Sequence, residues 1–353
     1  MKRLVSLLLI LAFTLGCNKV PDDPKPEFNK ATLLSNISGE IILPSIAQFS
    51  ADLNNLSAVY SQFSTDQTQA NFVGVQEAIQ TAYLTWQTVK IFDFGPIRTN
   101  GIKSAIGTYP SDTAVIASNI ASGSYNLSSL SNADAIGLSA LDYLFFKQGA
   151  LNELQTNANY LTYAGDVIAK MVAEFAVVTN QWTTYKATFD ASKGTSSTSA
   201  FSEFVNEFNR DFELAKNAKI GIPLGKQSLG IQLPEYIEAR YSGISLDLLE
   251  ESIRALQKVY NGVGFTSGVN GQGFDDYLVH LEKEQLDATI DNGFTAIINK
   301  TVSFTNTLEQ EMAVNIPQLD VLYSLLQGHV IHIKTDMTSS FGVLITYQDN
   351  DGD

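Results

Sequence analysis

The sequence is poor in residues on which common catalytic and structural sites are built. Its 353 residues include one cysteine, three histidines and two tryptophans. A single cysteine excludes a disulfide within the chain, so stability must come from the hydrophobic core. The sequence also contains no Gly-x-Ser-x-Gly elbow and no glycine-rich phosphate loop. Their absence removes the usual signals of serine hydrolases and nucleotide-binding enzymes.

Positive charge is also scarce. The chain has 22 lysines and arginines against 37 aspartates and glutamates, for a net charge of −15. An acidic surface of this kind repels phosphate backbones, so we expect no nucleic-acid partner.

The longest apolar run is short and lies at the N-terminus. It extends from Leu4 to Leu15 after the positively charged Met1-Lys2-Arg3. A bilayer span needs about 20 residues, so the run fits a signal peptide better. Its end, Thr14-Leu15-Gly16-Cys17, resembles a bacterial lipobox. We therefore predict a lipoprotein signal peptide over residues 1–17 with Cys17 as the lipidated anchor. The alternative is an ordinary secretory peptide with an incidental thiol.

Residues 18–28 are rich in proline and charge, so we expect a flexible tether. Together with the lipobox, this predicts an exported protein that contacts the membrane through its lipid anchor. The protein would then lie in the periplasm or at the outer membrane, with display at the cell surface as an open alternative.

Apolar residues recur every three or four positions along most of the chain, which predicts an all-α fold. These stripes are Ile46–Tyr60, Phe72–Val89, Phe201–Phe212, Leu249–Tyr260, Leu286–Ile297 and Leu319–Ile333. Only Gly342–Tyr347 looks extended. The Gly-, Pro- and Ser-containing segment 101–111 indicates a loop, and the polar segment 190–199 indicates a linker. We therefore predict two packed helical bundle domains, 29–189 and 200–348, followed by an acidic tail, 349–353.

Three local motifs stand out from the helical background. The first is WQTVKIFDFGPI at 86–97, and the second is GLSALDYLFF at 137–146. The third is GIPLG at 221–225, followed by EARYSGIS at 238–245. A helix over the second motif would place Ser139 and Asp142 one turn apart.

In their order and spacing, these motifs resemble the imelysin family of bacterial envelope proteins. The resemblance extends from Ile42-Leu43-Pro44-Ser45 to the C-terminal DNDGD and implies two helical bundles. Founding members of that family were described as metallopeptidases, and others belong to iron-uptake systems of the periplasm or outer membrane. The acidic pair Asp22-Asp23 is similar to signals of surface-displayed lipoproteins of the Bacteroidetes.

The family signature is Gly-x-His-x-x-Glu. Here Gly137 is kept, Ser139 replaces the histidine and Asp142 replaces the glutamate. A serine hydroxyl is a poor ligand for zinc or iron, so a metal site at this motif loses its best ligand. Enzymatic activity is left undecided, and a non-catalytic role is favoured.

Asp142 lies in an otherwise apolar segment, so a buried carboxylate there needs a partner. Arg98 and Arg240 are the candidates. With Ser139 and Tyr241, these residues are the predicted ligand-binding set, placed in a cleft between the bundles. A purely structural polar cluster is the alternative.

His329 and His332 have i, i+3 spacing on a predicted helix, which is compatible with one metal ion. We take Asp142, His329 and His332 as candidate metal ligands, although no His-Glu-x-x-His motif is present. The cofactor is left open, with a divalent metal or iron as the candidates.

Three functions follow. The first is a non-catalytic ligand- or metal-binding component linked to iron uptake, working with envelope uptake proteins. The second is a metallopeptidase with an altered site. The third is a surface module that binds another protein.

Overall fold

The structure is a computed structural model that describes residues 26–347. The predicted signal peptide, Cys17, most of the tether and the acidic tail lie outside the described residues. Within 26–347, no helix combines the length and apolar character needed to cross a membrane.

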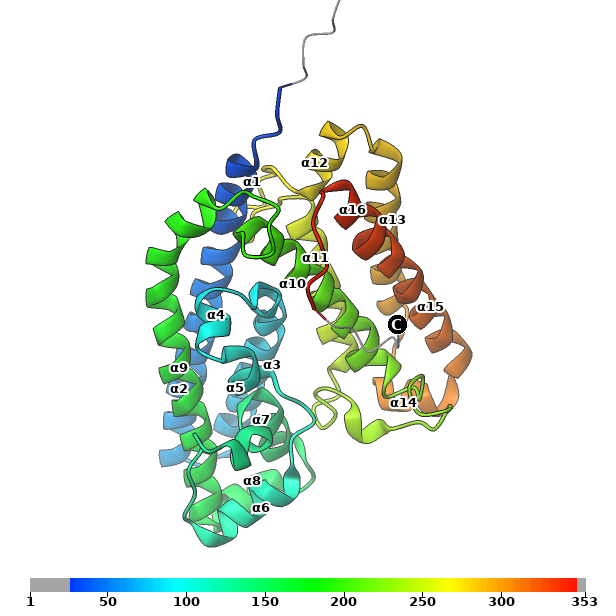
Figure 1. Cartoon of the computed structure of the whole chain (residues 1–353). Helices are drawn as coiled ribbons and strands as arrows, with labels where there is room; N and C mark the ends of the chain where they lie inside the picture. The colour runs from blue at the N-terminus through cyan, green and yellow to red at the C-terminus, as the bar shows by residue number, and fades with distance from the viewer. Residues whose placement is uncertain (1–25, 348–353) are drawn as a thin grey trace, which may run out of the picture.

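The predicted all-α class is confirmed, since residues 26–347 form helices and no strand. Two groups of helices lie side by side (Figure 1). The first group runs as follows: α1 (Lys30–Asn36), η1 (Ile37–Ile42), α2 (Leu43–Thr65), α3 (Gln69–Val89), η2 (Lys90–Phe92), α4 (Pro96–Thr99), α5 (Ile102–Gly107), α6 (Thr113–Ser122), η3 (Leu130–Ala135), α7 (Gly137–Phe146), α8 (Ala150–Thr156) and α9 (Ala158–Ala191).

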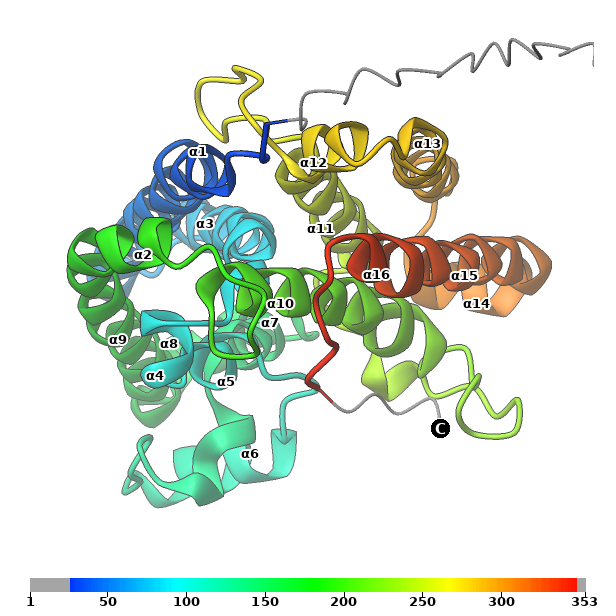
Figure 2. The ribbon, with the colours of Figure 1, turned by 45° about the horizontal axis from the view of Figure 1, so that its top comes forward.

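The second group begins after a short connection and ends near the C-terminus. It comprises α10 (Ala200–Leu214), η4 (Ala215–Gly221), η5 (Pro234–Tyr236), α11 (Ser245–Tyr260), α12 (Phe274–His280), α13 (Glu284–Thr301), α14 (Leu308–Val314), α15 (Ile316–Val330), η6 (Ile331–Met337) and α16 (Thr338–Ser340). The view in Figure 2 shows α1, α2 and α9 on one flank and α13 and α15 on the other.

One local expectation was wrong. Segment 101–111 contains α5 rather than only a loop. Segment 342–347 joins no strand; instead the Asn206 side chain accepts from the Thr346 N–H at 2.8 Å and donates to the Leu344 carbonyl at 3.0 Å. A side-chain amide thus replaces the neighbouring strand.

The predicted stripes form the buried faces of the helices. Phe49, Leu53 and Leu56 of α2 are buried, as are Phe204 and Phe208 of α10. The longest helix, α9, continues to Ala191, and α10 begins at Ala200. The predicted linker therefore coincides with this helix–helix connection, while the division into two domains stays a prediction.

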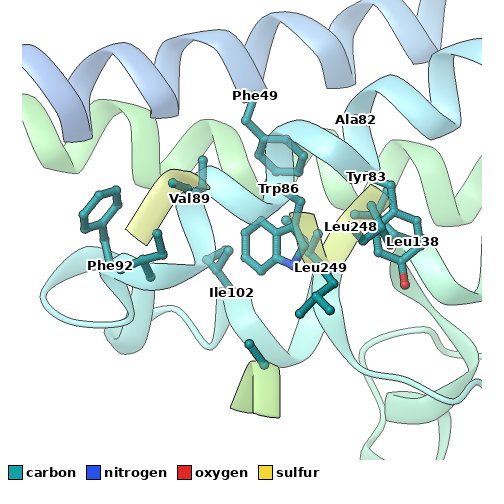
Figure 3. Close-up of a cluster of buried hydrophobic side chains, with 14 of the residues drawn as sticks. Phe49, Ala82, Tyr83, Trp86, Val89, Phe92, Ile102, Leu138, Leu248 and Leu249 are labelled. Carbon is teal, nitrogen blue, oxygen red and sulfur yellow. The ribbon is translucent and has the colours of Figure 1, made fainter. Parts of the chain in front are cut away.

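One continuous hydrophobic core joins the two groups. Helix α11 packs on α3, and α10 packs on η2. Figure 3 shows Leu248 and Leu249 of α11 beside Trp86 and Tyr83 of α3. All four side chains are almost completely buried. We call this junction the seam.

Pro44 leaves a helix carbonyl free to accept a hydrogen bond from the second group of helices. It lies in the first turn of α2, directly after the π-helical η1. Proline has no N–H, so the carbonyl four residues earlier loses its helical donor. That carbonyl, of Glu40, accepts instead from the Phe265 N–H at 2.7 Å. A distant loop thereby docks against the start of α2.

Leu249→Ala tests whether the groups unfold together. Truncating this fully buried leucine should lower the free energy of unfolding by about 2–5 kcal/mol. Both tryptophans lie in the first group, and Leu249 lies in the second. Urea transitions followed by tryptophan fluorescence and by circular dichroism should therefore shift to the same lower midpoint. An unchanged fluorescence transition beside a biphasic dichroism transition would show that the groups unfold separately.

Candidate functional site

The motif residue Gly137 sets the position of α7. Its φ is +78°, and a Cβ there would lie 2.5 Å from the Ile106 carbonyl oxygen. Only glycine combines this backbone conformation with so close an approach. Helix α7 consequently begins directly against the end of α5 and directs Ser139 and Asp142 toward the seam.

Asp142 joins α7 to the segment of the third motif. Its Oδ2 accepts from the Tyr241 N–H and its Oδ1 accepts from the Ser242 N–H, each at 2.9 Å. Burial raises the pKa of Asp142 to about 6, although these hydrogen bonds pull it downward. The predicted pairing with Arg98 or Arg240 was wrong, because backbone N–H groups supply the partners.

Ser139, which stands where the family signature has histidine, makes two hydrogen bonds to Ser111. Its hydroxyl oxygen accepts from the Ser111 N–H, and its carbonyl accepts from the Ser111 hydroxyl, both at 3.2 Å. Ser139 thereby holds the segment after α5 against α7.

A cavity of about 250 Å³ lies beside these two residues. Ser139, Asp142, Arg240 and Tyr241 all lie in its wall, so the structure brings four of the predicted ligand-binding residues together. Arg240 is held there by Glu309, which accepts from its Nε at 3.0 Å and its Nη2 at 2.6 Å. We call this space the Asp142 cavity.

Arg98 is not part of this wall. Its guanidinium pairs with Glu207 of α10 instead, with Glu203 at the limit of an ion pair, 4.0 Å away.

The predicted metal ligands do not meet. His329 is 3% exposed and packs between the rings of Phe212 and Phe294, at centroid distances of 5.0 and 4.4 Å. Burial lowers the pKa of His329 to about 3, so its imidazole is neutral. His332 lies on the π-helical η6, partly exposed, with Nδ1 3.2 Å from Asp336. Within residues 26–347, no three His, Cys, Asp or Glu side chains gather closely enough to hold a metal.

A second, larger cavity of about 390 Å³ adjoins the first, and Pro110 and Tyr236 belong to both walls. Sequence reasoning missed it. Its wall includes three lysines and three acids from both helix groups, namely Lys90, Lys103, Lys219, Asp93, Asp211 and Glu238. We call it the lysine cavity.

Buried ion pairs form the floor of the lysine cavity. Lys90 Nζ lies 2.7 Å from both carboxylate oxygens of Asp211 and donates to Ser252 Oγ at 3.1 Å. Burial alone would raise the pKa of Asp211, but Lys90 and then Lys103 outweigh burial and hold it below its ordinary value. Lys219 pairs with the equally buried Glu238.

A weak sequence signal for this cavity existed. Lys90 interrupts the apolar stripe between Val89 and Ile91, and Asp211 directly precedes the buried Phe212. Charges inside an otherwise apolar helix face indicate buried partners. The spacing does not reveal which partners these are.

The pKa of Asp142 predicts a pH-dependent stability. An acid whose pKa rises from 3.8 to about 6 on folding binds its proton more tightly in the folded state. Its contribution to stability therefore falls as pH rises from about 4 to about 6, by about 3 kcal/mol in total. Asp142→Asn removes this titration. We expect the free energy of unfolding of the wild type, relative to that of Asp142→Asn, to fall by about 3 kcal/mol between about pH 4 and about pH 6. Urea denaturation at a series of pH values measures this difference.

Asp134→Asn provides the control, because Asp134 is exposed. The pH dependence measured for Asp142→Asn is compared with that of this exposed substitution. A level difference for Asp142→Asn would contradict the raised pKa.

Comparison with known proteins supports the architecture. The chain is similar to a candidate iron-regulated protein A precursor from Parabacteroides distasonis, with a TM-score of 0.75 and 13% identity, covering 91% of this chain and 97% of that one. It is also similar to an imelysin-like protein from Psychrobacter arcticum, with a TM-score of 0.72 and 13% identity, covering 90% and 97%. No curated protein matches the sequence.

The family model described as Imelysin matches residues 42–315. This range includes the Gly137 motif and every residue that lines the two cavities. The chain therefore belongs to the imelysin family.

Proposed function

We propose that this imelysin-family chain is a non-catalytic binding component of an iron-uptake system in the cell envelope. Its ligand site would be formed by the Asp142 cavity and the lysine cavity together. The observation that carries this proposal is that both cavities lie at the seam and share Pro110 and Tyr236. Polar groups converging in a partly apolar cavity are the usual form of a small-molecule site.

The geometry favours binding over peptide hydrolysis. The family's histidine position holds Ser139, whose hydroxyl accepts from the Ser111 N–H. Both oxygens of Asp142 already accept backbone hydrogen bonds. A hydrolytic metal centre needs about three protein ligands and an open position, and residues 26–347 offer no such group.

The iron connection rests on the name of a relative. The structurally similar protein from Parabacteroides distasonis is named as a candidate iron-regulated protein. An uptake role also fits a protein tethered to the envelope, which the lipobox-like Thr14-Leu15-Gly16-Cys17 supports.

Filling the lysine cavity tests the binding role. Ala218 lines this cavity, whereas Ala114 is exposed on α6 and lines neither one. In a deletion strain grown on limiting iron, Ala218→Phe should fail to restore growth because the added ring occupies the ligand's space. Ala114→Phe should restore growth as the wild type does. Growth that does not depend on the gene at all would contradict the iron role, and equal rescue by both variants would contradict the cavity's role.

Cys17→Ser tests the anchor. Loss of the sulfur should abolish metabolic labelling with radioactive palmitate and move the chain from the membrane fraction to the soluble fraction. One acyl chain gives only marginal attachment and several give lasting attachment. Unchanged membrane association of the variant would contradict lipid anchoring at Cys17.

A further inference from the structure

Lys103 is the one lysine of the cavity wall whose ammonium lacks a close acceptor. The lysine projects from α5, and its Nζ is fully buried without a hydrogen-bond partner within the described residues. Asp211 Oδ1 lies 3.8 Å away, beyond hydrogen-bond distance. A buried ammonium without an acceptor costs folding free energy.

The surrounding carboxylates are already engaged. Lys90 takes both oxygens of Asp211, and Lys219 takes Glu238. Asp93, the remaining acid of the wall, lies 3.7 Å from Arg210 Nη1. With Arg210, the wall carries four cationic side chains against three acids, which leaves one formal positive charge in excess. What the cavity lacks is a single acceptor with one negative charge.

The rest of the wall is suited to an apolar body. Trp86, Pro110, Leu214 and Ile222 line the same space as Lys103. At Gly107 a Cβ would lie 2.5 Å from the indole Nε1 of Trp86, so the absence of a side chain there lets α5 lie directly against the indole. Apolar walls with one charged group at the end of the cavity favour ligands that combine both features.

We propose that the lysine cavity binds a small organic monocarboxylate, with its carboxylate on Lys103 Nζ and its apolar body against Leu214 and Ile222. A charge-assisted hydrogen bond to the ligand replaces the acceptor that the chain does not supply. A dianionic phosphate fits less well, because Asp93, Asp211 and Glu238 line the same wall.

This proposal names a class of ligand for the lysine cavity. It rests on the proposed function only in taking that cavity as a ligand site. Iron-dependent growth and carboxylate binding are measured separately. A failure of one leaves the other standing.

Calorimetric titration of the purified full chain tests the proposal, with benzoate as the probe. Benzamide has nearly the same shape without the charge, and inorganic phosphate has charge without the apolar body. Benzoate should bind saturably with a Kd near or below about 1 mM, which is within reach of a fragment-sized ligand. Benzamide and phosphate should bind at least about tenfold more weakly.

Lys103→Met keeps most of the apolar stem and removes the ammonium. It should weaken benzoate at least about tenfold while raising the melting temperature, because an unpaired buried charge is lost. Lys300→Met is the matched control, since Lys300 binds Gln318 on another face and lines neither cavity. It should leave benzoate affinity unchanged.

Trp86 reports where benzoate sits. The chain has two tryptophans, so Trp182→Phe leaves Trp86 as the only tryptophan. Its fluorescence should change in step with the calorimetric saturation. Equal affinity for benzoate and benzamide, tighter binding of phosphate, or unchanged benzoate affinity in Lys103→Met would each overturn the proposal. Absence of saturable benzoate binding in the wild type would overturn it as well.

Discussion

The ion pair between Lys90 and Asp211 fixes the relation between the two groups of helices. Lys90 lies where α3 passes into η2, and Asp211 lies on α10, so one buried contact of 2.7 Å ties the end of one helix to the last turn of another across the seam. Removing one partner of such a pair leaves an uncompensated buried charge, at a cost of about 3–5 kcal/mol. The pair also determines the electrostatics of the lysine cavity. Lys90 takes both oxygens of Asp211, whereas Lys103 Nζ stays 3.8 Å from Oδ1 and makes no hydrogen bond to the described residues.

Asp142 illustrates how a family motif can keep its geometry while its chemistry changes. Gly137 still places α7 against α5, and Asp142 still directs a carboxylate to the seam. That carboxylate now fastens α7 to the backbone of Tyr241 and Ser242. The segment that it holds also carries Glu238, the partner of Lys219. Cohesion and the proposed binding therefore depend on the same few residues.

The sequence was sufficient where local periodicity decides the structure. The stripes in α2, α3 and α10 follow the 3.6-residue helical period, and Ser139 and Asp142 lie one turn apart as their spacing requires. It was insufficient where partners come from afar. Lys103 and Asp211 are distant in the chain, and the N–H groups that bind Asp142 carry no side-chain signature. The i, i+3 spacing of His329 and His332 also misled, because α15 gives way to the π-helical η6 between them. The wider π turn puts the two imidazoles in different surroundings, one buried and one exposed.

Tyr236 belongs to the walls of both cavities. It lies on the short η5 turn and remains 41% exposed, so few neighbours restrain it. An occupant that displaces this ring from one cavity necessarily changes the volume of the other. Occupancy of the two cavities is then thermodynamically linked. If the first ligand changes the affinity of the second by some factor, the second changes the affinity of the first by the same factor. Under that condition, a single aromatic side chain would couple the two neighbouring cavities.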